Sequence, residues 1–204
     1  MDRVLILLAG FPGTGKSFLG SIIKKKLGIL TVISPDEIKE DFFDYYGFRN
    51  LDEKEELINL AWEKFYDVLE SQMVMGNNVI LDYPFSDKQK PSISRMSEMY
   101  HYQVITIRLI ADLDVLFERQ KNRDLDTSRH LSHIVKSYKK GDNLEHRKDA
   151  DNLLTYEEFM RRCTTRGYDT FELGVLFEVD VTDYATVDYA SLLNEVSMSI
   201  GDRG

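Results

Sequence analysis

The stretch VLILLAGFPGTGKS, residues 4–17, decides how this chain folds. Residues 4–9 form an apolar run without alternation, as in a strand that is buried on both faces of a parallel sheet. Residues 10–17 then match the pattern G-x-x-x-x-G-K-[ST] at every fixed position, and helical features begin at Lys16. A buried strand, a glycine-rich turn and a helix in direct succession predict an α/β protein.

The glycine-rich turn has the composition of a loop that cradles phosphates. Glycines allow backbone N–H groups to converge on a triphosphate, and the start of the following helix adds a favourable dipole. Lys16 is expected to bridge the β- and γ-phosphates, and the Ser17 hydroxyl to complete the coordination of Mg²⁺. The alternative is an ordinary strand-to-helix turn, but four fixed positions match by chance in only about one chain in a hundred of this length. We therefore expect ATP to bind at Gly10, Phe11, Pro12, Gly13, Thr14, Gly15, Lys16 and Ser17.

Four further apolar runs suggest four more strands, at residues 30–33, 79–81, 104–110 and 175–181. Segments with helical signals separate them, at residues 16–27, 36–45, 52–75, 91–100, 113–123, 156–164 and 189–200. Asp52 is the expected N-cap of the long helix, and Gly28 and Gly76 are expected to end the first and third helices. No linker interrupts the pattern, so residues 1–204 are expected to form one domain, a parallel sheet flanked by helices.

The composition excludes several classes of protein. Lys and Arg number 26 against 35 Asp and Glu, a net charge of -9, which argues against extended binding to nucleic acid or to an anionic membrane. The single cysteine, Cys163, excludes an internal disulfide and a multi-cysteine zinc site, and fits a reducing, cytoplasmic compartment. No apolar run is long enough to span a bilayer, so no membrane partner is expected.

One segment departs from the overall acidity. Residues 119–148 hold nine Lys or Arg against four Asp or Glu, a net charge of +5, which leaves -14 for the rest of the chain. His130, His133 and His146 lie there too. On sequence alone, such a run is more often a solvated surface segment than a binding site.

Asp36 is the candidate base. It follows the second predicted strand, at the sheet edge where open α/β proteins bind ligands. A hydroxyl that attacks a γ-phosphate needs a carboxylate to accept its proton. The competing interpretation is an ordinary helix start, with Ser34 as N-cap and Pro35 in the first turn, and without other signals that interpretation is the stronger one.

Asp82 ends the predicted strand at residues 79–81, a pattern in which the carboxylate holds Mg²⁺ directly or through water. Any strand that runs into a turn can finish on aspartate, but the phosphate loop favours a functional role for Asp82 toward the metal or the substrate.

Arg119 and Arg123 have the i, i+4 spacing that places two side chains on one helix face. Such arginines neutralise charge on a transferring phosphoryl group, although exposed helix arginines are common. Arg129, with His130 and His133, could add contacts to an anion. Histidines three residues apart in a polar segment are more often exposed than metal ligands.

These elements together resemble the P-loop kinases that include the kinase domain of polynucleotide kinase, chloramphenicol phosphotransferase and the zeta-type toxin kinases. The resemblance runs from Val4 to about Ile200, and the motifs that carry it are GFPGTGKS at 10–17, SPDEIK at 34–39, VILD at 79–82, RxxxR at 119–123 and RHxxH at 129–133. It implies a five-stranded parallel sheet in the order 2-3-1-4-5, and a mobile lid over about residues 119–150. It also implies that adenine lies between the base of this lid and the loop after Thr182.

By this resemblance Asp36 is the base on the acceptor hydroxyl, and Arg119 and Arg123 clamp the phosphates. Two positions depart from the family pattern. Lys39 stands where many relatives have arginine, which keeps the charge but loses the bidentate fork, so a grip on a phosphate-bearing acceptor is less secure. The lid sequence reads HLSH at 130–133 instead of HPGH, which implies a different local shape.

The leading functional hypothesis is an ATP- and Mg²⁺-dependent kinase that acts on a hydroxyl of a small molecule or a nucleoside-like acceptor, with Asp36, Lys39, Asp82 and Arg129 on the acceptor side. An ATPase or nucleotide-dependent switch that acts on a protein partner is one alternative, and a polynucleotide 5′-hydroxyl kinase is another. The aromatic residues that either line the acceptor pocket or pack in the core are Tyr45, Tyr46, Phe48, Tyr83 and Phe85.

Overall fold

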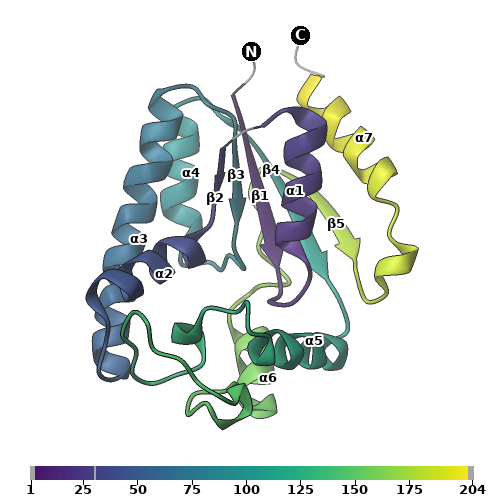
Figure 1. The fold of residues 1–204 in the computed structure, drawn as a ribbon. Helices are drawn as coiled ribbons and strands as arrows, with labels where there is room; N and C mark the ends of the chain where they lie inside the picture. The colour runs from purple at the N-terminus through teal and green to yellow at the C-terminus, as the bar shows by residue number, and fades with distance from the viewer. Residues whose placement is uncertain (1–2, 30, 202–204) are drawn as a thin grey trace.

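A five-stranded parallel sheet forms the centre of the computed structural model, which describes residues 3–29 and 31–201 (Figure 1). The strand order is β2-β3-β1-β4-β5, as the family resemblance implied. The strands are β1 Val4–Gly10, β2 Thr31–Ile33, β3 Val79–Asp82, β4 Gln103–Ile110 and β5 Val175–Asp180. Leu30, which the sequence assigned to the second strand, lies outside the described residues.

The central strand β1 is buried on both faces along its whole length, which confirms the reading of its unbroken apolar run. Alternate side chains of a strand point to opposite faces, so β1 contributes to two separate apolar cores. Val4, Ile6 and Leu8 pack with residues of the first and last helices, whereas Leu5 and Leu7 pack on the other side of the sheet.

The helices cover both faces of the sheet and its lower edge in Figure 1. Their bounds are α1 Lys16–Leu27, α2 Pro35–Tyr46, α3 Leu51–Val74, α4 Lys90–Met99, α5 Leu113–Leu125, α6 Tyr156–Thr165 and α7 Tyr189–Gly201. α1 and α7 lie on one face, and α3 and α4 on the other. α5 and α6 lie beyond the carboxyl ends of the strands (Figure 1). Across the described ranges, no helix is long and apolar enough to cross a membrane.

The long helix begins differently from the sequence prediction. Asn50, not Asp52, is the N-cap of α3, because the Asn50 side chain accepts a hydrogen bond of 2.9 Å from the Glu53 backbone N–H. Asp52 lies in the first turn instead, where a carboxylate is favourable toward the helix dipole. Gly28 ends α1 in the left-handed conformation, with φ of 68°, as predicted.

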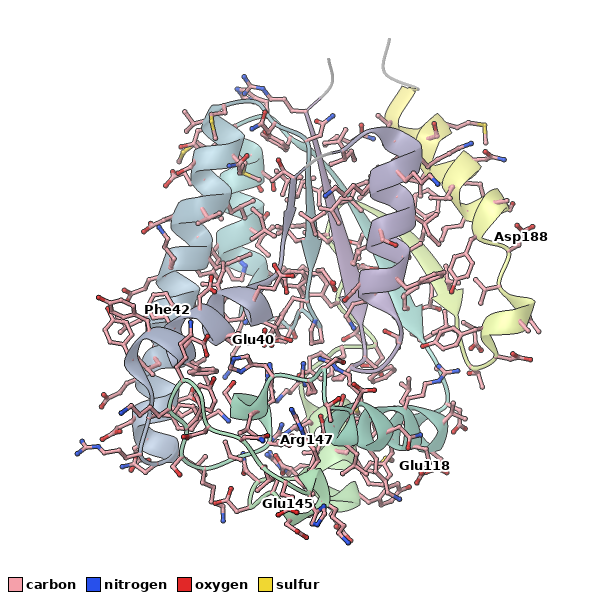
Figure 2. The ribbon with its side chains drawn as sticks, in the orientation of Figure 1. Glu40, Phe42, Glu118, Glu145, Arg147 and Asp188 are labelled. Atoms are coloured by element: carbon pink, nitrogen blue, oxygen red, sulfur yellow. The ribbon has the colours of Figure 1, made fainter. Side chains whose placement is uncertain are left out.

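The lid segment, residues 119–150, is docked against α2. Phe48 and Tyr138 exchange two backbone hydrogen bonds of 2.8 Å. The His133 ring lies 2.5 Å from Glu40, which Figure 2 labels on α2 above the lid segment. Arg147, also labelled there, donates to the carbonyls of Arg129 and Thr127 and so ties the segment to itself. The segment that the sequence predicts as a lid therefore lies against α2, at the carboxyl edge of the sheet (Figure 1).

At Gly174, just before β5, the backbone lies in close contact with Val104 of β4. A Cβ on Gly174 would lie 2.0 Å from the Val104 carbonyl oxygen, and its φ is +73°. Gly28 has a similar φ, +68°, but a Cβ there would meet nothing within 4 Å. We expect Gly28→Ala to lower the free energy of unfolding by about 1 kcal/mol and Gly174→Ala by roughly 3 kcal/mol or more, as measured by urea denaturation. Equal losses of unfolding free energy in the two variants would show that the close approach of Gly174 to the Val104 carbonyl adds nothing to the cost of the substitution.

Candidate active site

Glycine backbone conformations and hydrogen bonds from Lys16 determine the shape of the phosphate loop between β1 and α1. Gly10, Gly13 and Gly15 have φ angles of 101°, 83° and 80°, values that other residues rarely adopt. The Lys16 ammonium donates to the Phe11 carbonyl at 2.6 Å and to the Gly10 carbonyl at 3.3 Å. The loop thus curves around its lysine, with Gly15 immediately before the start of α1.

Burial changes the acidity of Lys16. Desolvation lowers its pKa from 10.5 to about 8, opposed by the charge of Asp82 and assisted by that of Arg123. The ammonium is therefore still charged at neutral pH but titrates just above it. Phosphate oxygens placed in the loop would favour the charged form.

A cavity of about 630 Å³, here called the nucleotide cavity, opens from the phosphate loop. It brings together most of the residues that the sequence marked as functional, from five separate parts of the chain. The predicted residues in its walls are Pro12, Gly13, Gly15, Lys16, Ser17, Asp36, Asp82, Arg119, Arg123 and Arg129. Phe11 instead packs in a core cluster with Tyr168, and Thr14 is buried, its hydroxyl donating to the Phe11 carbonyl at 2.8 Å.

Ser17 and Asp82 fit a magnesium site. Burial raises the pKa of Asp82, while the neighbouring Ser17 hydroxyl and Lys16 ammonium favour its ionised form. Within residues 3–29 and 31–201, no three carboxylate, histidine or cysteine side chains cluster as a complete metal site. One hydroxyl and one carboxylate leave most coordination positions to water and phosphate oxygens, the arrangement that suits Mg²⁺.

The two arginines of α5 have different surroundings. Arg119 donates to the carbonyls of Val181 and Thr182 at 2.9 and 2.8 Å, and its guanidinium lies 3.9 Å from the centre of the Tyr184 ring. The Tyr184 hydroxyl donates to Gly13 at 3.1 Å, so Arg119 links α5 to the loop after β5 and to the phosphate loop. The Arg123 side chain is exposed and makes no hydrogen bond or ion pair in the described part of the chain.

Asp36 is held by Lys39, one helical turn later. The Lys39 ammonium lies 3.1 Å from the Asp36 carboxylate and donates to the Tyr83 hydroxyl at 2.9 Å. Burial alone would raise the pKa of Asp36, but Lys39, with His133 and Arg129 nearby, holds this pKa well below its usual range. Asp36 is therefore ionised at neutral pH. α2 does begin with Ser34 and Pro35, so the helix start and the charged site coexist, although the Ser34 side chain makes no capping hydrogen bond.

A second cavity of about 630 Å³, here called the acceptor cavity, lies beside the first. Asp36, Tyr83 and His133 line both cavities, so the candidate base stands at their junction. The structure also decides among the aromatic residues. Phe48 and Phe85 are buried in the core and Tyr45 and Tyr46 are exposed, which leaves Tyr83 as the one of these five at the cavity.

The basic motif of the lid segment is directed partly to the cavity and partly to α2. Arg129 lines the nucleotide cavity, and its Nε is buried without a hydrogen-bond partner among the described residues; the nearest carboxylate, Asp124, is 3.8 Å away. His130 and His133 instead face carboxylates of α2, Asp44 at 3.1 Å and Glu40 at 2.5 Å. Burial is the main cause of the lowered pKa of His133.

Arg162 and Arg166, at the end of α6, line both cavities, and the sequence reading missed them. Their spacing of four residues repeats that of Arg119 and Arg123, which is the signal that could have found them. The sequence does not predict them as site residues, because no phosphate-loop motif and no predicted strand end lies near them. Only the fold brings α6 beneath the phosphate loop.

Solved structures share this fold. A "putative kinase" from Chloroflexus aurantiacus J-10-fl has a TM-score of 0.76 and 22% identity, with all of both chains covered. A sugar kinase from Janibacter sp. HTCC2649 has a TM-score of 0.53 and 11% identity, over 96% of this chain and 92% of that one. A gluconokinase from Sinorhizobium meliloti 1021 has a TM-score of 0.52 and 14% identity, over 98% and 93%. A search of curated proteins finds no match. At these identities the likeness shows the fold alone.

The family model described as AAA domain, AAA_33, matches residues 5–140. The match covers more than half of the chain and includes the phosphate loop, Asp36, Asp82 and the arginines of α5. The parallel sheet in the order β2-β3-β1-β4-β5 and the loop between β1 and α1 give the chain a P-loop kinase-like fold. The chain therefore belongs to this AAA domain family.

Proposed function

We propose that this protein is an ATP-dependent kinase that transfers the γ-phosphoryl group to a hydroxyl of a small acceptor. The observation that carries the proposal is the position of Asp36, which lines both the nucleotide cavity and the acceptor cavity. A base for phosphoryl transfer has to reach the acceptor hydroxyl while that hydroxyl faces the γ-phosphate.

The residues divide the work of transfer by their positions. The phosphate loop and Lys16 hold the β- and γ-phosphates, and Arg123 and Arg129 neutralise charge that develops on the transferring group. Asp36 orients the acceptor hydroxyl and takes its proton as the new oxygen–phosphorus bond forms and the bond to the β-phosphate oxygen breaks. Because this transition state is loose, orientation by the carboxylate matters more than its basicity.

Mg²⁺ bound by Ser17 and Asp82 would neutralise phosphate charge. The chain's own residues supply the remaining cations around the nucleotide. Arg119, whose guanidinium donates to the Val181 and Thr182 carbonyls and lies over the Tyr184 ring, is in our proposal a wall of the nucleoside site. Arg123, exposed and unengaged in the described structure, is the better candidate for a phosphate clamp.

The acceptor cavity favours transfer over simple hydrolysis. An ATPase needs room for one water beside the γ-phosphate, whereas this cavity has about the same volume as the nucleotide cavity. Volumes of roughly 300–1,000 Å³ suit small-molecule ligands. The lid segment also contacts α2, the helix that carries Asp36, and in our proposal it limits the access of water to the γ-phosphate.

Replacement of the candidate base tests the kinase proposal. We expect Asp36→Asn to lower the rate of transfer of labelled γ-phosphate by about 10²- to 10⁴-fold, because the amide neither orients the hydroxyl as the carboxylate does nor accepts its proton. The KM for ATP should change by less than about twofold, since Asp36 is not part of the phosphate loop. The measurement is a screen of sugars, hydroxy acids, nucleosides, antibiotics and oligonucleotide ends as acceptors.

Asp41→Asn is the matched control for Asp36→Asn. Asp41 is an exposed aspartate on the same helix, and it lines neither cavity. Its replacement should leave transfer unchanged. Transfer that survives Asp36→Asn at the full rate would remove the base assignment, and acceptor-independent ATP hydrolysis raised by a protein partner would favour the switch function.

The lowered pKa of Lys16 predicts proton uptake when nucleotide binds. Below pH 8 the lysine is already charged, whereas above about pH 8 it is partly neutral and must gain a proton to contact the phosphates. We expect Mg-ATP binding at pH 9 to take up as much as one proton and at pH 7 almost none from this group. Titration calorimetry in two buffers with different ionisation enthalpies measures this. Identical binding enthalpies in both buffers at pH 9 would contradict the pKa.

A further inference from the structure

The acceptor cavity carries positive charge in an acidic protein. Its walls contain five cationic side chains and three acidic ones, a net charge of +2, against -9 for the whole chain. The cations come from α2, α3, the loop before α4 and the end of α6, namely Lys39, Lys54, Lys88, Arg162 and Arg166. The acids are Asp36, Glu55 and Asp87.

The protein itself neutralises only two of these cations. Lys39 pairs with Asp36 at 3.1 Å, and Arg162 pairs with Glu158 at 2.6 Å. Lys54, Lys88 and Arg166 form no ion pair within the described ranges. Lys54 donates to the Ser132 carbonyl at 2.6 Å, and Arg166 donates to the Tyr168 hydroxyl at 3.2 Å. Neutral oxygens satisfy these donors without cancelling their charge.

Lys54 is the most constrained of the three. It is half-buried, with its ammonium 5.2 Å from the centre of the Phe48 ring. Burial, together with the positive charges of Arg162 and Arg129, lowers its pKa to about 8. Gathering like charges away from water costs free energy, and a bound anion would relieve it.

Two aromatic side chains also line the acceptor cavity. Trp62 and Tyr83 meet edge to face with ring centres 5.0 Å apart, and both line the cavity. Such a wall accommodates the carbon skeleton of a small molecule, while the cations address a charged group. Asp36 at the junction repels an anionic group, so that group is expected at the Lys54 side of the cavity and the reacting hydroxyl at the Asp36 side.

We propose, building on the kinase function proposed above, that the acceptor is a small organic anion whose carboxylate or phosphate group is bound by Lys54 and Arg166, with Arg162 beside them. Its hydroxyl then faces Asp36 and the γ-phosphate. Lys54 and Arg166 are thus specificity-determining residues, not members of the catalytic set.

Matched pairs of acceptors test the charge requirement. An aldonic acid is compared with the alditol of the same carbon skeleton, and a sugar phosphate with the free sugar, each with Mg-ATP and the full-length chain. We expect the anionic member of at least one pair to have a kcat/KM about ten- to a hundredfold higher than its neutral partner. The two pairs separate a carboxylate from a phosphate ligand. Equal values within both pairs, or transfer only to oligonucleotide ends, would overturn the proposal.

Charge-removing variants identify the residues that bind the anion. Lys54→Met and Arg166→Gln should each raise the KM for the anionic acceptor about ten- to a hundredfold. Lys54 lines only the acceptor cavity, so Lys54→Met should have little effect on the KM for ATP or for the neutral partner. Lys64→Met is the control, since Lys64 is exposed on the same helix as Lys54 and lines neither cavity. Arg166 is exposed and its replacement should leave folding intact, so it keeps the test valid if Lys54→Met unfolds.

A binding measurement separates this inference from the kinase function. Inorganic phosphate and citrate are titrated by calorimetry into the protein saturated with Mg²⁺ and a non-hydrolysable ATP analogue, so that the nucleotide cavity is filled. Binding that Arg166→Gln weakens, without transfer to any acceptor, would retain the anion site and reject the kinase. Transfer to neutral acceptors at rates that neither variant changes would retain the kinase and reject the anion site. If neither phosphate nor citrate binds, the anion site is also rejected.

Discussion

The close contact between β1 and β4 is the constraint on which the site depends. A Cβ on Gly10 would lie 1.9 Å from the Leu109 carbonyl oxygen, so only glycine fits at the end of β1. The same residue begins the phosphate loop, which turns sharply enough for Lys16 to reach back to the Gly10 and Phe11 carbonyls. Sheet packing and phosphate binding therefore place demands on one backbone position. The apolar burial of β1 supplies the rigidity that holds it there.

Electrostatic balance organises the rest of the site. Asp36 and Asp82 lie among lysines and arginines from the phosphate loop, α2, α5, α6 and the lid segment, and their pKa values move in opposite directions. Lys39 stabilises the charge of Asp36, whereas burial makes the charge of Asp82 costly. In the proposed mechanism the two carboxylates of this cavity therefore have different tasks: Asp36 is ionised beside the acceptor, and Asp82 binds a cation.

The sequence predicted the parts of this structure that depend on local rules. The unbroken apolar run of β1, the glycine pattern of the loop and the i, i+4 pair in α5 each have a short-range physical cause. The family resemblance gave the strand order. The lining of the acceptor cavity could not be predicted from the sequence. Lys54, Arg162 and Arg166 come to line one cavity only after α3 and α6 pack around the lid segment. The sequence predicted Asp52 instead of Asn50 as the N-cap of α3. Both residues have side chains that can cap a helix, and they lie within one turn of each other.

The attachment of the lid segment to α2 has a consequence for how the two ligands influence each other. The helix that receives His130, His133 and Tyr138 is also the helix that carries Asp36 and Lys39. His133 of this segment lines both cavities, so a displacement of the segment would change both at once. By thermodynamic linkage, a nucleotide that stabilises the docked segment strengthens acceptor binding by the same factor that the acceptor strengthens nucleotide binding. Cooperation between the two proposed substrates would in this sense be a property of one helix surface.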